Sequence, residues 1–195
     1  MPDHYFTSKP TSDHRIYSFQ TEVRNYMLTF ETDAGVFSRD GLDPGSRLLI
    51  ESLPPMTGRL LDMGCGWGPV GLFLKKMNPA AEIVMSDINE RALDLTVRNA
   101  KRNGLTVETV LSDGFAAIEG RFDHVVTNPP IRAGKDVIYG LFDAAREHLT
   151  ETGDLTIVIR KQQGAPSALK HLSETYAEAR VTARGGGYWI ISASV

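Results

Sequence analysis

The chain has 195 residues, of which 42% are hydrophobic and 23% charged, and its formal net charge is −3. This length allows one domain with a full-sized core and is too short for two ordinary domains. The slightly negative charge argues against a freestanding, non-specific nucleic-acid binder, which usually carries a strong basic excess, but it does not exclude an enzyme that meets RNA through one local patch.

Several features predict a soluble protein of the cytoplasm. The N-terminal segment MPDHYFTSKP is polar and lacks the apolar stretch of a signal peptide. No apolar run approaches the roughly 20 residues that a membrane-spanning helix needs. The only cysteine, Cys65, excludes an internal disulfide and a cysteine-rich metal site, and the histidines show no metal-ligand spacing. We therefore expect no membrane partner and no metal.

The first fifty residues differ in pattern from the rest. Residues 15–32 are rich in aromatic and β-branched side chains, which predicts one or two antiparallel strands. Asp43 and Pro44 are suited to the cap and first turn of a helix over residues 45–53. We interpret residues 1–52 as an extension or lid on a core formed by residues 53–195, so that the whole chain makes a single domain.

From Arg59 onward, strand-like apolar runs alternate with amphipathic helical stretches, which is typical of a parallel α/β sheet. Strands are predicted over residues 59–64, 82–88, 107–113, 122–130 and 155–161. Helices are predicted over residues 69–77, 90–103, 136–149 and about 167–178. Gly153 is expected to turn the chain into its strand, and the glycine run 185–187 to join a terminal hairpin. The pattern predicts a Rossmann-like, mostly parallel seven-stranded sheet with an antiparallel C-terminal edge.

A glycine-rich turn, LLDMGCGWGPVG over residues 60–71, joins the first core strand to a helix. Glycines at this place allow a tight turn and a close approach of the backbone to a ligand. The motif alone is weak evidence for a ligand-binding site, because a tight strand-to-helix turn that binds no ligand can have the same glycine pattern. The candidates for cofactor binding in this loop are Gly64, Cys65, Gly66 and Gly68, although Cys65 is also suited to packing as a small apolar group.

Acidic residues follow the next two strands. Asp87, with Ile88 beside it, ends the second strand about 20 residues beyond the glycine loop, where nucleotide-binding folds place a carboxylate on ribose hydroxyls. Asp113, with Gly114, is placed to contact the exocyclic amine of an adenine. A loop turn without a binding role is an equally good interpretation of these two residues. Because the carboxyl ends of parallel strands meet at one crevice, these residues together predict a nucleoside-containing cofactor.

The loop reads G-x-G-x-G followed by Pro69, and not the G-x-G-x-x-G of nicotinamide and flavin sites, where a pyrophosphate sits on the helix N-terminus. The order and spacing of the motifs resemble the class I S-adenosylmethionine-dependent methyltransferases. This resemblance implies that S-adenosyl-L-methionine is the cofactor and that Asp62 lies close to its amino acid end. The cofactor carries a sulfonium cation and no phosphate, which suits an acidic site.

The fourth strand ends in TNPPI, residues 127–131, which resembles the N/D-P-P-aromatic motif of methyltransferases that act on planar amines. Such an amine is a poor nucleophile because its lone pair is delocalised. The side-chain oxygen of Asn128 and the carbonyl of Pro129 can each accept one N–H and aim the lone pair at the methyl group. Pro129 and Pro130 fix this backbone. The alternative is a strand end followed by a rigid turn.

Four segments together resemble the guanine-N2 methyltransferases of small-subunit (16S) ribosomal RNA; they are residues 35–51, the glycine loop, residues 127–135 and residues 160–165. The resemblance runs from about residue 4 to the end of the chain and is best with single-domain members of the family. It implies a methylated guanine amine as product and ribosomal RNA or the small ribosomal subunit as partner. It also implies a pocket lined by Gly35, Val36, Phe37 and Ser38.

Substrate contacts are predicted beyond the proline pair. Ile131 stands where many relatives have an aromatic residue that stacks on the target base, so this stacking is lost there, and our hypothesis is that Phe37 supplies it instead. The target base would have to be unpaired or flipped out. Basic residues after the fourth and fifth strands are expected to hold RNA phosphates, unless they are simply solvated loop charges; they are Arg132, Lys135, Arg160 and Lys161.

Two other functions remain open at this point. Protein glutamine and adenine N-methyltransferases share the N/D-P-P motif, although Ile131 and Arg132 fit them less well. The second alternative is a non-catalytic module that binds S-adenosylmethionine. The presence of Asp62, Asp87 and Asn128 argues against this alternative. The sequence does not identify the target nucleotide, the oligomeric state, or whether free RNA or an assembled subunit is the substrate.

Overall fold

The computed structural model describes residues 15–36, 38 and 41–195. The strands are β1 (Tyr17–Val23), β2 (Tyr26–Thr32), β3 (Arg59–Met63), β4 (Glu82–Asp87), β5 (Glu108–Leu111), β6 (Phe122–Thr127), β7 (Leu149–Arg160), β8 (Glu178–Gly185) and β9 (Tyr188–Ser194). The helices are α1 (Pro44–Ser52), α2 (Pro69–Met77), α3 (Glu90–Arg102), α4 (Lys135–Glu147) and α5 (Ala165–Thr175), with short 3-10 turns η1 (Ile131–Ala133) and η2 (Lys161–Gln163).

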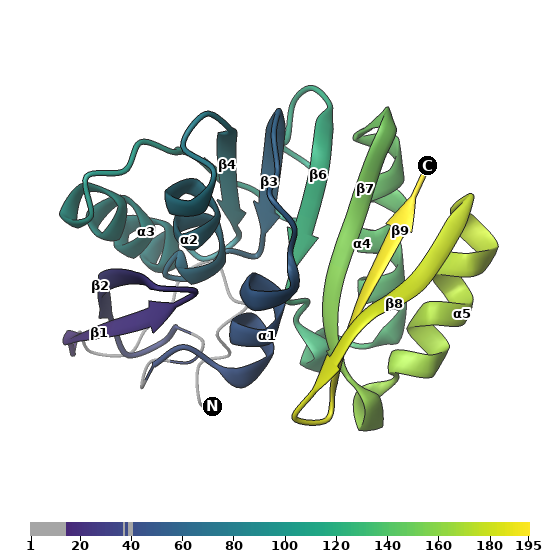
Figure 1. Cartoon of the computed structure of the whole chain (residues 1–195), viewed down its shortest axis with the longest axis horizontal. Helices are drawn as coiled ribbons and strands as arrows, with labels where there is room; N and C mark the ends of the chain where they lie inside the picture. Colours follow the sequence, from purple (N-terminus) through teal and green to yellow (C-terminus); the bar gives the residue numbers. More distant parts are fainter. Residues whose placement is uncertain (1–14, 37, 39–40) are drawn as a thin grey trace.

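A seven-stranded sheet in the order β5-β4-β3-β6-β7-β9-β8 forms the centre of the molecule (Figure 1). Strands β5, β4, β3, β6 and β7 are parallel, and β9 runs antiparallel to both of its neighbours. The chain first adds strands on one side of β3 and then returns to add β6 and β7 on the other side. This reversal creates a crevice at the carboxyl ends of β3 and β6, which is where open α/β sheets bind ligands.

Both faces of this sheet are covered by helices. Leu60 of β3 belongs to an apolar cluster with α1, α2 and α3, whereas the next residue, Leu61, belongs to a second cluster with α4 and α5. Successive side chains of a strand point to opposite faces, so the two clusters lie on opposite sides of the sheet. Both leucines are fully buried, which explains why the strand reads as a continuous apolar run.

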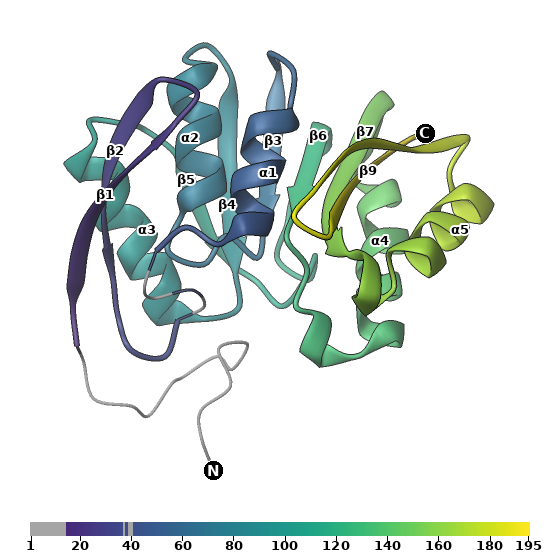
Figure 2. The same ribbon diagram turned by 60° about the horizontal axis from the view of Figure 1, so that its bottom comes forward.

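The β1–β2 hairpin forms a separate two-stranded sheet that packs against α3 (Figure 2). Asn99 of α3 accepts a hydrogen bond from the backbone N–H of Glu31 and donates one to its carbonyl oxygen, at 2.7 and 2.9 Å. Asn103, one turn later, does the same for Thr29 at 2.9 and 2.8 Å. The two amides thus substitute for a neighbouring strand along the edge of β2. Asn99 also donates to the carbonyl oxygen of Trp67, which ties the hairpin to the glycine loop.

The predicted mixed sheet, its antiparallel C-terminal edge and the N-terminal strands and helix are confirmed, and several boundaries need correction. The strand predicted over 122–130 ends at Thr127, and the helix predicted over about 167–178 ends at Thr175. The helix predicted over 136–149 ends at Glu147, and Leu149 begins β7 by pairing with Phe122. Gly153 is not a turn but lies inside β7, within the stretch where the register between β6 and β7 shifts. Leu149 fits the apolar spacing of the helix and an inward-facing position of the strand equally well. The spacing of apolar residues alone therefore does not decide whether Leu149 ends the helix or begins the strand. In the part of the chain described, no helix is long and apolar enough to cross a membrane.

Candidate active site

A cavity of about 720 Å³ lies at the carboxyl ends of the parallel strands. Its walls come from the glycine loop, the ends of β4, β6 and β7, the loop after β5, the first residue of β9 and the first turn of α1. The volume falls within the roughly 300–1,000 Å³ of small-molecule sites. This is the crevice at which the sequence predicts the cofactor and the acceptor to meet.

The first two glycines of the loop face this space. Gly64 and Gly66 have φ of 69° and 59°, and a Cβ atom built on either would meet no atom within 4 Å. Gly68 has φ of 94°, does not line the cavity, and a Cβ there would lie 3.0 Å from Oγ1 of Thr96 on α3. The loop therefore offers bare backbone to a ligand at Gly64 and Gly66, whereas Gly68 closes the turn against a helix.

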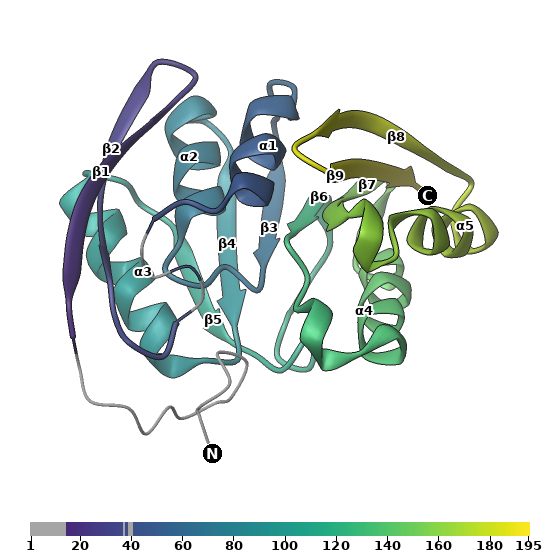
Figure 3. The same cartoon turned by 90° about the horizontal axis from the view of Figure 1, so that it is seen from below.

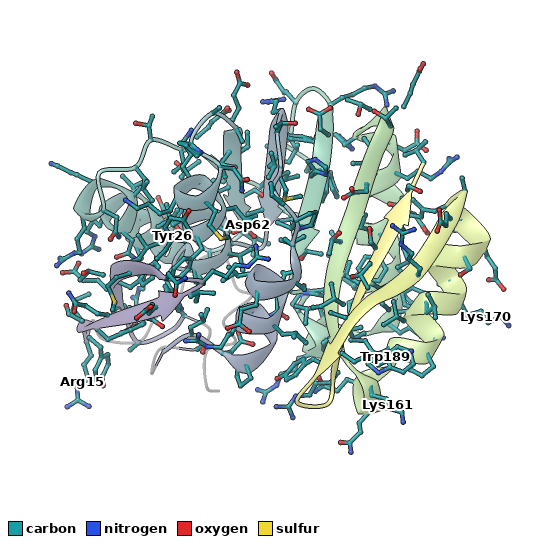
Figure 4. The ribbon with its side chains drawn as sticks, in the orientation of Figure 1. Arg15, Tyr26, Asp62, Lys161, Lys170 and Trp189 are labelled. Carbon is teal, nitrogen blue, oxygen red and sulfur yellow. The ribbon has the colours of Figure 1, made fainter. Side chains whose placement is uncertain are left out.

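Two largely buried carboxylates stand beside the loop. Asp62 is 2% exposed, and its Oδ2 accepts a hydrogen bond of 2.8 Å from the backbone N–H of Gly71. Burial raises the pKa of Asp62 to about 7, the Gly71 hydrogen bond opposes this rise, and the charge of Asp87 adds to it. Figure 4 shows Asp62 near the middle of the molecule.

Asp87 closes the loop from the end of β4. Its Oδ2 accepts from the N–H of Gly66 and its Oδ1 from the N–H of Asn89, both at 2.8 Å. Burial raises the pKa of Asp87, although these backbone hydrogen bonds oppose the rise. Within the described residues neither Asp62 nor Asp87 forms an ion pair, so this end of the cavity favours a cationic ligand.

The remaining predicted cofactor residues also line the cavity. Asp113 is exposed at its rim, beside Gly114, and Ile88 follows Asp87 at the end of β4. Cys65 is buried, and burial raises the pKa of its thiol, so the side chain packs as a neutral group. Val36 and Ser38 line the cavity, Gly35 does not, and Phe37 lies outside the described residues.

Asn128 follows β6 directly, and its side chain is held by α1. Its amide nitrogen donates to Oγ of Ser46 at 3.0 Å and to both carboxylate oxygens of Asp43 at 3.4 Å. Asp43 in turn caps α1 by accepting from the N–H groups of Gly45 and Ser46. Within the described residues Oδ1 of Asn128 has no partner, so this oxygen is left to accept a hydrogen bond. Pro129 and Pro130 line the cavity next to it.

The basic residues divide into two groups. Arg132 and Arg160 line the cavity, as does the half-buried Ile131. Lys135 lies outside it, with Nζ 5.0 Å from the ring centroid of Tyr139. Lys161 also lies outside it, at the margin of the molecule in Figure 4, and lines a second hollow of about 220 Å³. The lining of that hollow is Arg160, Lys161, Gln162, Gly186 and Gly187.

The charge of the cavity changes sign along the sheet. Asp113 after β5, Asp87 at the end of β4 and Asp62 in β3 are acidic. Asn128 after β6 comes next, and Arg160 at the end of β7 is basic. Because strands β5, β4, β3, β6 and β7 are adjacent in that order, Asn128 stands between an acidic half and a basic half, and the carboxylate of Asp43 lies beside Asn128 where the two halves meet.

Among the cavity residues that sequence reasoning missed, Asp43, Ser46 and Tyr188 bear most on the chemistry. That reasoning interpreted Asp43 only as a helix cap, which is correct but incomplete, and it took the strand of Tyr188 as an edge of the sheet. The segment 35–51 carried the only signal for Ser46, since it belongs to the resemblance and contains α1. In the described residues no group of three or more His, Cys, Asp or Glu side chains is arranged to hold a metal ion.

Comparisons with known proteins match this architecture. A family model described as the methyltransferase small domain matches residues 27–192. A Bacillus subtilis (strain 168) protein named uncharacterized protein YbxB is 44% identical over 99% of this chain and 98% of its own length. Ribosomal RNA small subunit methyltransferase C of Aeromonas hydrophila is 40% identical over 77% of this chain, and the match spans 46% of that relative, about half its length.

Among solved structures, a 16S rRNA N2 methyltransferase of T. thermophilus, in complex with AdoMet and guanosine, superimposes with a TM-score of 0.82. The match covers 95% of this chain and 52% of that chain, at 24% sequence identity. At this identity the likeness establishes the fold alone. The predicted Rossmann-like methyltransferase fold is confirmed by it.

Proposed function

The chain belongs to the methyltransferase small domain family, and on that premise we propose that it transfers a methyl group from S-adenosyl-L-methionine to N2 of a guanine in small-subunit (16S) ribosomal RNA. One observation carries the proposal: the cavity is acidic on one side of Asn128 and basic on the other. The acidic half suits a cationic donor, the basic half suits a polyanionic acceptor, and Asn128 lies where the two meet.

The residues of the acidic half fit the donor. S-adenosylmethionine supplies a methyl group activated by a positively charged sulfonium. The ionised forms of Asp62 and Asp87 are disfavoured by burial, and a cationic ligand reverses this. Gly64 and Gly66 leave open backbone for its amino acid end, Asp87 accepts from the ribose hydroxyls, and Asp113 meets the adenine. A pyrophosphate cofactor would instead place negative charge beside the buried Asp62 and the half-buried Asp87.

Asn128 and Pro129 orient the acceptor. Oδ1 of Asn128 and the carbonyl oxygen of Pro129 each accept one N–H of the exocyclic amine. With both hydrogens held, the nitrogen lone pair is directed toward the acidic half of the cavity and the nitrogen is helped to become pyramidal. Asp43 and Ser46 hold the Asn128 amide so that its oxygen, and not its nitrogen, faces the amine. The methylated amine then releases its extra proton to water.

The basic half binds the RNA strand. Arg132 and Arg160 are positioned for phosphates next to the target nucleotide, and Lys161 extends this surface into the second hollow. The name of the Aeromonas hydrophila relative, ribosomal RNA small subunit methyltransferase C, supports this class of substrate. The target base enters unpaired or flipped out, since a stacked base cannot reach Asn128. Such a substrate implies an enzyme of the cytoplasm.

We also propose that residues 1–52 are an integral extension of one methyltransferase domain. The first turn of α1 supplies Asp43 and Ser46 to Asn128, so the core beginning at residue 53 lacks part of the site. On this view the extension completes the active site and is more than a lid.

The decisive experiment uses small ribosomal subunits and ribosomal RNA that lack their own methyl groups. The enzyme is incubated with methyl-labelled donor, and the products are digested and identified by nucleoside mass spectrometry. We expect N2-methylguanosine from the wild-type enzyme. We expect Asn128→Ala to bind the donor in calorimetry and to transfer no methyl group. Label in protein, or in adenine, would overturn the substrate, and donor binding without any transfer would favour a non-catalytic module.

A further inference from the structure

Tyr188, the first residue of β9, lines the same cavity as Asn128. Side chains of β9 alternate between the two faces of the sheet: Tyr188 packs against the cluster that includes α1, whereas Trp189 packs against the cluster of α4 and α5. Figures 2 and 3 both show the turn between β8 and β9 beside α1. The antiparallel edge therefore brings an aromatic ring to the basic end of the cavity.

The ring of Tyr188 is held at one face and along one edge. The guanidinium carbon of Arg160, its partner in the β7–β9 ladder, lies 4.8 Å from the ring centroid. One edge of the ring rests against the first turn of α1, where a Cβ atom on Gly45 would lie 2.8 Å from Cε1 and 3.0 Å from Cδ1 of Tyr188. Gly45 immediately precedes Ser46, which holds the Asn128 amide. Consecutive residues of one helical turn thus position both the ring and the amide.

A base held at Asn128 needs a flat surface to cover it. In this chain residue 131 is isoleucine, so the position after the prolines cannot provide an aromatic one. Aromatic side chains stack on bases of any sequence because every base has a π-face. An arginine over one face of a tyrosine adds a favourable cation–π contact and fixes the ring.

Resting on the function proposed above, we propose that Tyr188 is the residue that stacks on the target base, with Arg160 as its backing. Arg160 also lines the second hollow with Lys161, so a base at Tyr188 would have its neighbouring phosphate beside two cations. The substrate class is then a nucleotide within a strand. The side-chain amide of a glutamine has no ring, so stacking on Tyr188 would not stabilise it in the cavity.

The test compares Tyr188→Leu with Tyr188→Phe in the full-length enzyme. Both variants fill the space against Gly45, but only phenylalanine keeps the aromatic face. For transfer to unmethylated small subunits, we expect Tyr188→Leu to lower kcat/KM by about ten- to a hundredfold and Tyr188→Phe to restore most of it. We expect donor affinity, measured by calorimetry, to change less than about twofold in both.

Arginine variants give a matched comparison. Arg184, on the hairpin that carries Tyr188, lies over Trp189 with its guanidinium carbon 4.6 Å from the ring centroid, but it does not line the cavity. We expect Arg160→Ala to raise KM for the RNA substrate several-fold and Arg184→Ala to leave it unchanged. Equal effects of the two would mean that only positive charge at this edge of the sheet matters, and would overturn the backing role.

The outcomes separate this inference from the function on which it rests. A wild-type enzyme that transfers no methyl group to RNA overturns the proposed function. Transfer by the wild-type enzyme with equal activity of Tyr188→Leu and Tyr188→Phe overturns the stacking role alone. A parallel loss of donor affinity in Tyr188→Leu would overturn it as well, because the residue would then be acting through the fold.

Discussion

The side-chain amide nitrogen of Asn128 donates a hydrogen bond of 3.0 Å to the hydroxyl oxygen of Ser46, which lies 82 positions earlier in the chain. The same nitrogen is 3.4 Å from both carboxylate oxygens of Asp43, the residue that caps α1. The central residue of the proposed mechanism is therefore oriented by a helix outside the α/β core. An amide with its nitrogen anchored in this way presents its oxygen, which is the atom that the acceptor amine requires.

Replacing Ser46 by alanine removes this anchor. Because a misplacement of about 1 Å can cost a hundredfold in rate, we expect Ser46→Ala to lower kcat by about ten- to a hundredfold, with little change in donor affinity. Ser52→Ala is the matched control: Ser52 is also on α1, and its hydroxyl donates to the carbonyl oxygen of Leu49 away from the cavity. Steady-state kinetics and donor calorimetry measure both, and an unchanged kcat in Ser46→Ala would contradict the anchor.

The glycine loop permits an equally matched pair. Gly64 and Gly104 have φ of 69° and 64°, and a Cβ atom on either meets nothing within 4 Å, but only Gly64 lines the cavity. An alanine in this left-handed region costs about 1–2 kcal/mol at each site, so both variants should lose similar thermal stability. We expect only Gly64→Ala to weaken donor binding, by tenfold or more, because its methyl group occupies ligand space. Equal donor affinities in the two variants would exclude Gly64 from the donor site.

How far the sequence predicts this site depends on the reach of each contact. Asp87 and the glycine loop belong to one strand–helix–strand unit, and their meeting follows from the order of its elements. The residues next to Asp43 in the sequence are enough to predict it as the N-cap of α1. Its contact with Asn128 depends on where α1 packs, and no local sequence pattern encodes that. The sequence does not predict the role of Tyr188 for the same reason. This residue begins β9, and it reaches the cavity only because β9 pairs with β7.

Donor binding should depend on the protonation of Asp62. Its pKa is about 7 in the protein without donor, and a cationic ligand favours the ionised carboxylate. Affinity should therefore rise as the pH increases from about 5 to 7 and then level off, with a proton released on binding below pH 7. Calorimetry at pH 6 in buffers of different ionisation enthalpy measures this release. Binding without proton release at that pH would mean that Asp62 is not the group that senses the ligand.

The same carboxylate lowers the stability of the free protein at neutral pH. Its folded-state pKa is raised from 3.8 to about 7, so the folded state binds the proton more tightly than the unfolded state does. The free energy of unfolding should fall as the pH rises from about 4 to 7, and the loss should be complete above pH 7. Asp62→Asn avoids this cost, and we expect it to raise the free energy of unfolding by up to about 4 kcal/mol at pH 8. Denaturant unfolding should show no such gain near pH 4, and donor binding should be lost.

Lys161 and Lys170 test whether the second hollow holds an RNA phosphate. Both are exposed lysines, and Figure 4 shows them at separate places on the surface. Lys161 lines the hollow beside Arg160, whereas Lys170 lies on α5 with its Nζ 3.8 Å from Oε1 of Glu174.

Each charge that contacts a phosphate adds roughly one to the slope of log affinity against log salt concentration, because counterions are released. We expect Lys161→Ala to lower this slope by roughly one for unmethylated ribosomal RNA and Lys170→Ala to leave it unchanged. Identical slopes for the two variants would show that RNA does not reach the hollow.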